Sequence, residues 1–351
     1  MADDALPLGF ELGDYRIDGI LGQGGFAIVY RATHTERGYR VAVKELFPHD
    51  VVRRRPDLGV APVDAENERV FDVIRRDFDR EAALLFRFPH PYLPRIHAVL
   101  GAHDTFYLVM DFETGQPLDE WILAVPVRLR AERAMDMLGA VCEPLERLHR
   151  NDVFHNDIKP DNILVRDDGT PVLLDFGLAG YSDGARALGR QNLHFASDGY
   201  SPVELYTGGA TGPWTDVYAL AATAYRLLDG HVPVSAKHRA RSIYQGGPDP
   251  IARLSYSPRN ARQRQFLEAI AAGLRFDAAH RPQSLADWGR GWRQAAVLAP
   301  LPGRPKAKPG ARPRPGNPLR TLLPARIAAP LALAFLLLLV LAVCLAALFA
   351  R

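Results

Sequence analysis

No part of this sequence limits its fold more than a run of 24 residues near the end of the chain. Residues Ile327 to Ala350 carry no charged side chain, and most are Leu, Ala or Val. As a helix they would be about 36 Å long, enough to cross a hydrocarbon core of roughly 30 Å. A buried helix of a soluble core is the alternative, but the run is long for such a core. The run therefore predicts one transmembrane helix over 327–350.

The segment before this run, residues 299–326, is rich in proline and in positive charge. It holds eight prolines and seven basic residues, and no acidic one. Such a composition cannot bury a core and predicts an extended, disordered linker. Positively charged flanks stay on the cytoplasmic side of a membrane, and Arg351 alone follows the run. The prediction therefore places residues 1–326 in the cytoplasm.

The charge of the remaining chain argues against a nucleic-acid partner. Residues 1–298 hold 35 basic and 40 acidic residues, a formal charge of −5. Nucleic-acid binders carry their basic residues on the fold itself. The two cysteines, Cys142 and Cys344, offer no disulfide framework, which favours a reducing compartment. The first ten residues lack the basic start and apolar run of a signal peptide.

Small residues cluster between two strand-like segments near the N-terminus, where the sequence from Leu21 to Tyr30 is LGQGGFAIVY. Glycine lets a backbone turn approach phosphates closely and offer N–H groups to them. A plain hairpin turn is the alternative, and the motif alone does not decide between them. Lys44 ends the alternating stretch VAVK about twenty residues later. From the neighbouring strand it would reach phosphates held beneath the turn.

Two further motifs bring carboxylates together with an amine and an amide. The motif FHNDIKPDN places Asp157, Lys159 and Asn162 within six residues, and Pro160 favours a loop there. In such a loop, a carboxylate would orient a hydroxyl, an amine would neutralise a phosphoryl group and an amide would hold a metal. Asp175 opens a DFG triplet at the end of an apolar strand, a position that suits a Mg²⁺ ligand. Polar turns are the alternative for both motifs.

The order and separation of these four motifs resemble those of protein kinases over about residues 14–295. The resemblance implies an α+β fold of two lobes, followed here by one C-terminal transmembrane helix. A small β-rich N-lobe is expected over about 14–112 and a large, mainly α-helical C-lobe over about 113–295. Lys159 is the choice of Ser/Thr kinases at its position. The chain is therefore expected to be a eukaryotic-like Ser/Thr protein kinase of bacterial type, which transfers the γ-phosphoryl group of ATP to protein hydroxyls.

The resemblance also implies a role for each residue of the site. Asp157 matches the catalytic base, and Lys44 matches the lysine that binds phosphates and pairs with a helical glutamate, here Glu81. Asn162 and Asp175 match the ligands of Mg²⁺, with Mn²⁺ as an alternative ion. The implied catalytic residues are Asp157, Lys159, Lys44 and Glu81. The implied nucleotide-binding residues are Leu21, Gly22, Gly24, Gly25, Ala27, Val29, Ala42, Lys44, Met110, Asp111 and Phe112.

Three supporting contacts follow from the same resemblance. Glu204 is expected to form a structural salt bridge with Arg281. Asp216 is expected to hold the backbone of the catalytic loop. Ser197 is expected to steady the catalytic Asp157 and its neighbouring lysine.

Two positions and one segment depart from the family pattern. Ala27 replaces the third glycine of the loop, and Asn156 replaces the arginine that receives an activation-loop phosphate. Because a neutral Asn cannot bind that phosphate, activity is expected not to depend on phosphorylation of Ser182 or Ser201. The segment 45–77, between Lys44 and the expected helix, is unusually long and is interpreted as a solvated loop, with a regulatory or partner-binding role as the alternative.

Two other functions fit parts of the sequence. Asn156 is the best support for a pseudokinase, a membrane-anchored nucleotide-binding scaffold. A small-molecule phosphotransferase is the third possibility, which Arg281 and the activation segment disfavour. The complete catalytic set favours the active enzyme. The Ala- and Arg-rich composition favours a bacterial source, so a bacterial inner membrane is expected, with the lipid bilayer as partner through 327–350. The protein substrate, the activating signal and the oligomeric state stay unassigned.

Overall fold

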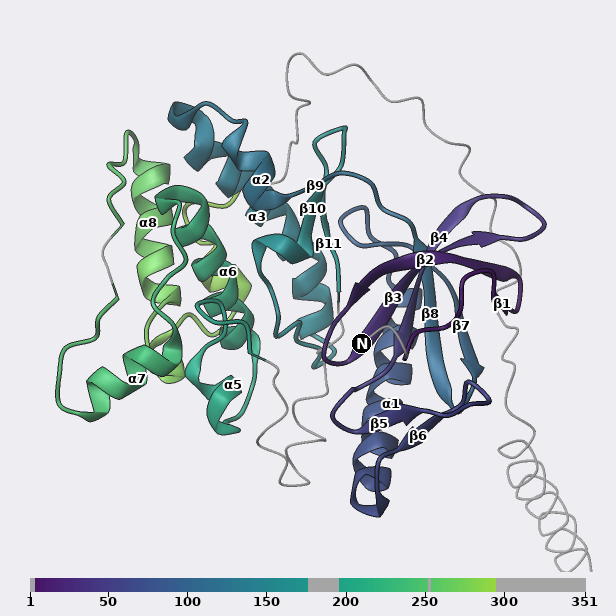
Figure 1. Ribbon diagram of the computed structural model, residues 1–351. Helices are drawn as coiled ribbons and strands as arrows, with labels where there is room; N and C mark the ends of the chain where they lie inside the picture. Colours follow the sequence, from purple (N-terminus) through teal and green to yellow (C-terminus); the bar gives the residue numbers. More distant parts are fainter. Residues whose placement is uncertain (1–3, 176–195, 252–253, 295–351) are drawn as a thin grey trace, which may run out of the picture.

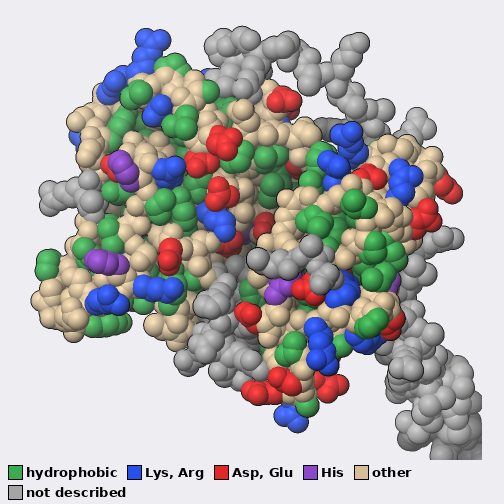
Figure 2. Space-filling view, in the orientation of Figure 1, with side chains coloured by type: hydrophobic (Ala, Val, Ile, Leu, Met, Phe, Trp, Pro, Cys, Tyr) green, Lys and Arg blue, Asp and Glu red, His purple; other side chains and the backbone are tan. Residues whose placement is uncertain are grey.

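The computed structural model describes residues 4–175, 196–251 and 254–294. The predicted linker and transmembrane helix lie outside these ranges, and no helix within them is long and apolar enough to cross a membrane. The described residues form the expected two-lobed α+β fold, with a sheet on one side and a group of helices on the other (Figure 1). On the face shown in Figure 2, acidic and basic side chains are scattered over both lobes.

Six antiparallel strands form the N-lobe sheet in the order β1-β2-β3-β4-β8-β7. Their bounds are β1 Glu11–Leu12, β2 Tyr15–Gln23, β3 Ala27–His34, β4 Arg40–Leu46, β7 Ile96–Ala102 and β8 Thr105–Asp111. Every residue of β4 after Arg40 is buried, so both faces of this central strand are covered. Because side chains alternate along a strand, Lys44 and Glu45 point to opposite faces of the sheet.

One long helix, α1 (Ala65–Arg87), packs against β7 and β8. Its buried residues recur at helical spacing, as expected for an amphipathic helix with one face on a core. The side chain of Asp64 caps the first turn, since its Oδ1 accepts a hydrogen bond from the Asn67 amide at 2.9 Å. Phe78 stacks on Phe106 of β8, with ring centroids 6.4 Å apart. These contacts fix the helix that carries Glu81.

The interpretation of residues 45–77 as a solvated loop is wrong. The strands β5 (Val52–Arg54) and β6 (Val60–Pro62) pair as an antiparallel hairpin, and α1 already begins at Ala65. The physical reason is the apolar content of the segment, whose buried side chains lie under the hairpin and along the first half of the helix. These buried residues are Val51, Val52, Val60, Val70, Phe71 and Ile74.

The C-lobe is built around α6 (Pro213–Asp229), which contacts α3 (Val127–His149), α8 (Ala261–Gly273) and α9 (Leu285–Trp288). The other helices are α2 Leu118–Leu123, α5 Val203–Thr207, α7 Ala236–Tyr244 and the short 3₁₀ turns η1 Pro160–Asn162 and η2 Ala278–His280. Twelve residues of α6 are buried, so this helix is the core of the lobe. Its alanines allow the neighbouring helices to approach closely.

A small sheet lies where the two lobes meet, in the strand order β11-β10-β9. Its strands are β9 Gln116–Pro117, β10 Ile163–Val165 and β11 Pro171–Leu173. The turn η1 leads directly into β10, and Asp175 follows two residues after β11. A Cβ at Gly115 would collide with the Val165 carbonyl, so only glycine allows this close approach. The sheet therefore places the HNDIKPDN motif beside Asp175.

Candidate active site

The carboxylate of Asp157 is held from three sides. Lys159 Nζ donates to Oδ2 at 2.8 Å, Ser197 Oγ donates to Oδ1 at 2.6 Å, and Asn162 Nδ2 donates to Oδ2 at 3.0 Å. Lys159 Nζ also donates to Ser197 Oγ at 2.8 Å. The expected support of Asp157 and Lys159 by Ser197 is confirmed. Oδ2 accepts two of these hydrogen bonds and Oδ1 accepts one, so Oδ1 keeps acceptor capacity in a fixed orientation.

Buried Asp216 anchors the backbone of this loop, as expected. Its Oδ2 accepts the His155 amide at 2.9 Å, and its Oδ1 accepts the Asn156 amide at 2.8 Å. Burial alone raises the pKa of Asp216, but the hydrogen bond and charge of His149 outweigh it, so the pKa is lowered. His149 Nε2 lies 2.7 Å from Oδ2. The sequence did not indicate this histidine.

Asn156 has a backbone reason to replace the usual arginine. Its φ is +63°, in the left-handed region. Asn enters that region at a lower cost than most residues because its short polar side chain makes local hydrogen bonds. The departure from the family pattern therefore suits the local backbone.

The predicted salt bridge between Glu204 and Arg281 is confirmed. Arg281 Nη1 lies 2.6 Å from Oε1 and Nη2 lies 3.1 Å from Oε2, and both side chains are buried. The two residues join α5 to the segment after η2. Ser201, just before α5, is 2 % exposed, and its Oγ accepts the Ser197 amide at 2.8 Å. Ser182 lies outside the described residues.

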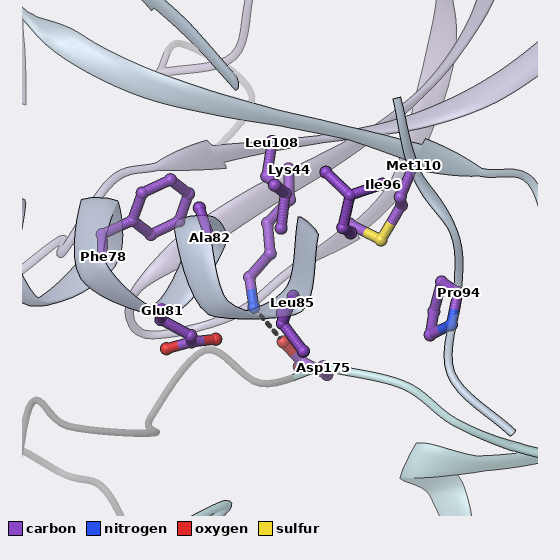
Figure 3. Close-up of a pocket in the computed structure, with 10 residues that line it drawn as sticks. All are labelled: Lys44, Phe78, Glu81, Ala82, Leu85, Pro94, Ile96, Leu108, Met110 and Asp175. Carbon is purple, nitrogen blue, oxygen red and sulfur yellow. Dashed lines mark hydrogen bonds and ion pairs between the residues drawn. The ribbon is translucent and has the colours of Figure 1, made fainter. Parts of the chain in front are cut away.

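Lys44 lies in the expected place but has another partner. Its Nζ donates to Asp175 Oδ1, as the dashed line in Figure 3 shows. The expected pair of Lys44 with Glu81 is not formed. Glu81 lines the same pocket, and its Oε2 is buried with no hydrogen-bond partner among the described residues. Asp175, with φ +59°, turns its carboxylate to the amine that Glu81 was expected to bind.

Opposite pKa shifts accompany this arrangement. Burial raises the pKa of Glu81 well above its usual range; the charge of Lys44 opposes this, whereas Asp175 and Asp77 raise it further. For Asp175 the charge of Lys44 is the largest influence and lowers the pKa. The charge of Lys44 thus favours the ionised form of Asp175, whereas burial favours the neutral form of the neighbouring Glu81.

The predicted nucleotide-binding residues gather on the sheet face that carries Lys44. The strand register pairs Val29 with Lys44 and Ala42 with Met110. Met110 also lines the pocket behind Lys44, together with apolar side chains of α1, β7 and β8. These apolar residues are Phe78, Ala82, Leu85, Ile96 and Leu108. The sheet thus presents a flat apolar surface next to a buried amine.

The predicted phosphate loop is the turn between β2 and β3. The Gly24 amide donates to the Ala27 carbonyl at 2.9 Å, which closes the turn. Nothing lies within 4 Å of the place where a Cβ of Gly22 or Gly25 would be, so the space around their backbone is open. Leu21, at the end of β2, is exposed at 46 %. The backbone at Gly22 and Gly25 is therefore open to the approach of another group.

The segment between the lobes begins at Asp111 and Phe112, which are both partly buried. Asp111 Oδ1 lies 2.7 Å from His97 Nε2. Glu113 next accepts two hydrogen bonds from Arg166, the first from Nε at 2.6 Å. The sequence showed no signal for the Glu113–Arg166 pair, because the two residues lie 53 positions apart.

The oxygen atoms at the catalytic loop suit a hard divalent ion. Asn162 Nδ2 donates to the Asp157 carbonyl at 2.8 Å as well as to its side chain, which leaves Asn162 Oδ1 as an acceptor. Asp175 keeps a second carboxylate oxygen beside Lys44. Amide and carboxylate oxygens are ligands for Mg²⁺ and Mn²⁺. No group of three or more His, Cys, Asp or Glu in the described ranges forms a metal site alone, so further ligands would come from phosphate oxygens and water.

Comparisons with known proteins agree with this geometry. Residues 15–285 match the family model described as the protein kinase domain. The chain is 31 % identical over 255 residues to the serine/threonine-protein kinase Pkn1 of Myxococcus xanthus, covering 71 % of this chain and 34 % of that protein. It is 30 % identical over 221 residues to the serine/threonine-protein kinase PrkC of Bacillus subtilis, covering 63 % and 31 %.

A plant protein and a solved structure are similar as well. The chain is 33 % identical over 224 residues to the CBL-interacting protein kinase 4 of Oryza sativa subsp. japonica, covering 63 % of this chain and 46 % of that protein. The chain thus spans less than half the length of these three relatives. The solved structure titled "PpkA-294 apo form" is similar with a TM-score of 0.66 and 27 % identity, covering 82 % of this chain and 99 % of that one.

Proposed function

Because this chain belongs to the protein kinase domain family, we propose that it is a Ser/Thr protein kinase that transfers the γ-phosphoryl group of ATP to protein hydroxyls. The observation that carries this proposal is the carboxylate of Asp157, which Lys159, Ser197 and Asn162 hold in one orientation. A scaffold that only binds nucleotide has no need of an oriented acceptor there. The names of the bacterial relatives support Ser/Thr specificity.

Asp157 acts on the incoming hydroxyl. It positions the oxygen for attack on the phosphoryl group and accepts its proton, while Lys159 offsets the negative charge that the phosphoryl oxygens carry. Both side chains are fixed by Ser197 before substrate binds. Positioning and electrostatic stabilisation supply most of the rate acceleration in such a site.

The opposite side of the site receives ATP. The open turn at Gly22, Gly24, Gly25 and Ala27, with Leu21 at its edge, covers the phosphates, and Lys44 binds them. Val29, Ala42 and Met110 pack on the adenine ring, whose polar edge faces the backbone of Asp111 and Phe112. The fit rests on the flat apolar sheet face beside the buried amine of Lys44.

Asn162 and Asp175 would hold the divalent metal. Mg²⁺, or Mn²⁺ in its place, would supply positive charge to offset that of the phosphates. For Asp175 to serve as a ligand, Lys44 must exchange Asp175 for the phosphates and Glu81. Ionisation of Glu81 would then be favoured by the ammonium group beside it. The Lys44–Asp175 pair therefore belongs to the protein without nucleotide.

A pseudokinase is the second candidate function. It is favoured by one observation, which is that Glu81 forms no ion pair with Lys44 in the described structure. In that case the chain would bind ATP, and the Lys44–Asp175 pair would persist in the complex.

Tethering to a membrane completes the proposal. The uncharged run at 327–350 supports it, together with the seven basic residues of 299–326. A bacterial inner membrane, with the kinase domain on its cytoplasmic side, is consistent with the charge of these flanks. Tethering would raise the effective concentration of the kinase toward substrates at that membrane.

The deciding experiment measures phosphate transfer and ATP binding together. The full chain, purified in detergent, is incubated with labelled ATP, Mg²⁺ and a generic basic protein, beside Asp157→Ala and Lys44→Met. Label on Ser or Thr that both variants abolish is the expected result. ATP that raises the unfolding temperature without any transfer would favour the pseudokinase. Neither binding nor transfer in a folded chain would refute the assignment of the site.

A further inference from the structure

A buried ion pair lies on the outer face of the N-lobe sheet, directly behind Lys44. Glu45 follows Lys44 in β4, and its side chain is 0 % exposed. Its carboxylate accepts two hydrogen bonds from Arg54, from Nη1 to Oε1 at 2.7 Å and from Nη2 to Oε2 at 2.6 Å. The hydroxyls of Tyr30 and Tyr107 donate to the same carboxylate at 2.7 and 2.8 Å. All these partners lie on the face opposite the nucleotide site.

Arg54 joins three parts of the N-lobe at one guanidinium group. It belongs to β5, but its Nε donates to the Asp4 carbonyl at 2.8 Å and its Nη1 to the Leu58 carbonyl at 3.1 Å. The guanidinium also lies over the Phe47 ring, 4.8 Å from its centroid. The N-terminal segment, the β5–β6 hairpin and the central strand β4 are thereby connected.

The hairpin in turn holds the beginning of α1. The Val63 amide donates to the Val51 carbonyl at 3.0 Å, and the Val60 amide donates to the His103 carbonyl of the β7–β8 turn at 2.8 Å. Asp64 follows immediately and caps α1. The first turn of the helix that carries Glu81 is therefore attached to the hairpin and to the sheet.

The chemistry of the pair favours a role in positioning. Burial alone lowers the pKa of Arg54, but its hydrogen bonds with Glu45 and the charge of that carboxylate outweigh burial and raise it. Ion pairs buried this deeply are often no more stabilising than well-packed apolar side chains, whereas they specify one geometry. A bidentate guanidinium–carboxylate pair also fixes both partners in one plane.

We propose that Arg54 is a positioning residue, whose ion pair with Glu45 holds the β5–β6 hairpin against β4. This contact sets the positions of Lys44 and of the α1 helix that carries Glu81. This inference rests on the proposed function, because the placement matters for phosphoryl transfer. The Arg54–Glu45 pair would then hold β4 from the face opposite Lys44, through the long segment between β4 and α1.

Three variants of the full chain separate positioning from stability. Arg54→Met removes the pair and leaves the Glu45 carboxylate buried without its counter-charge. Arg53→Met is the matched control, because Arg53 is the exposed neighbour on the same strand. The double variant Glu45→Gln with Arg54→Met removes the buried charge as well, so its unfolding temperature should return toward that of the unaltered chain.

The readouts are kcat, KM for ATP, unfolding temperature and hydrogen exchange of the amides in 65–87. We expect kcat of both Arg54→Met and the double variant to fall about tenfold or more, since small displacements of catalytic groups have such effects. KM for ATP should change less than kcat, and exchange in 65–87 should rise. Arg53→Met should match the unaltered chain in every readout.

Two results would overturn the inference. One is a kcat of Arg54→Met within about twofold of Arg53→Met. The other is a double variant that recovers kcat along with stability, because the pair would then only stabilise the fold. If the unaltered chain transfers no phosphate, the proposed function fails. The positioning role of Arg54 is then tested by hydrogen exchange alone. Equal exchange of 65–87 in the double variant and in Arg53→Met would then refute the positioning role.

Discussion

At the scale of single residues, the geometry of the site depends on whether Lys44 pairs with Asp175 or with Glu81, which line the same pocket. Lys44 can pair fully with one carboxylate, and Asp175 holds it in the described structure. Glu81 is left in an apolar pocket, where burial disfavours its charged form. The stability of the nucleotide-free protein should therefore depend on the protonation of Glu81.

Replacing Glu81 by Gln tests this dependence. In the unfolded chain the carboxyl titrates near 4.3, roughly its ordinary pKa, and the pKa in the folded protein is higher. The folded state therefore binds more protons in the interval between the two values, and stability falls as the pH rises through it. We expect Glu81→Gln to be more stable than the unaltered chain, with a larger difference at pH 8 than at pH 5, and to lose activity. Urea unfolding at both pH values measures this, and a difference independent of pH would contradict it.

The support of Asp157 by Ser197 gives a second prediction. A hydrogen bond to a charged group contributes roughly 1.5–3 kcal/mol, which corresponds to about tenfold or more in rate. Ser197→Ala is therefore expected to lower kcat about tenfold, with KM for ATP nearly unchanged, because the hydroxyl bonds to Asp157 and Lys159, which act on the substrate hydroxyl and the transferred phosphoryl group in the proposed mechanism. Ser197→Thr keeps the hydroxyl and should keep most of the activity. Steady-state kinetics decide, and a loss expressed only in KM would contradict the assigned role.

At the scale of elements, the close packing of α6 and α8 depends on a missing side chain. A Cβ at Gly273 would lie 2.6 Å from Ala221 Cβ and 3.2 Å from Trp288 Nε1. Gly139 in α3 is a natural control, since a Cβ there would meet only Arg293 Cγ, at an ordinary 3.5 Å.

We expect Gly273→Ala to lower the free energy of unfolding by about 1–3 kcal/mol, the usual cost of an overpacked core. Gly139→Ala should be neutral or stabilising by up to about 1 kcal/mol, because alanine favours the helix. Chemical denaturation of both variants checks the pair. Equal effects of the two substitutions would show that the contact between α6 and α8 is not tight.

The long segment before Glu81 shows where the sequence was insufficient at this scale. Its charged residues, Arg53 to Arg55 and the acidic stretch 64–68, suggested a solvated loop, but the Arg54 side chain is only 5 % exposed because it pairs with buried Glu45 of β4. Nothing near either residue in the sequence indicates this pairing. The same holds for Glu113 with Arg166 and for His149 with Asp216. Partners that meet only after folding leave no local pattern.

At the scale of the whole molecule, the two-lobed fold and the positions of the site residues were predictable from the sequence. The glycine-rich turn, Lys44 and the two loop motifs can each be recognised within a short stretch of sequence. Their order along the chain is typical of one family. The ion pair of Lys44 was not predictable, since Glu81 and Asp175 are chemically equivalent partners. The choice between them depends on the backbone at Asp175, which has a φ of +59°.

The proposed membrane anchor gives a prediction at this scale. The full chain should float with lipid vesicles in a density gradient. Arginine at both Leu337 and Leu341 should abolish flotation, because a charge at the centre of a spanning helix costs about 2.5–3.5 kcal/mol. Arginine at both Leu322 and Leu323 adds the same charge just before the run and should leave flotation intact. Flotation of the Leu337→Arg, Leu341→Arg variant with the vesicles would contradict a spanning helix.

The proposed role of Asp157 as catalytic base is tested most directly by the rate of phosphate transfer from ATP to Ser and Thr, measured for the full chain and for Asp157→Asn. The substitution keeps the shape of the side chain and removes the negative charge that orients and deprotonates the hydroxyl. We expect transfer by the unaltered chain and a loss of about a hundredfold or more in kcat for the variant, with ATP binding retained. Equal rates for the two chains would contradict the assignment of Asp157 as the catalytic base.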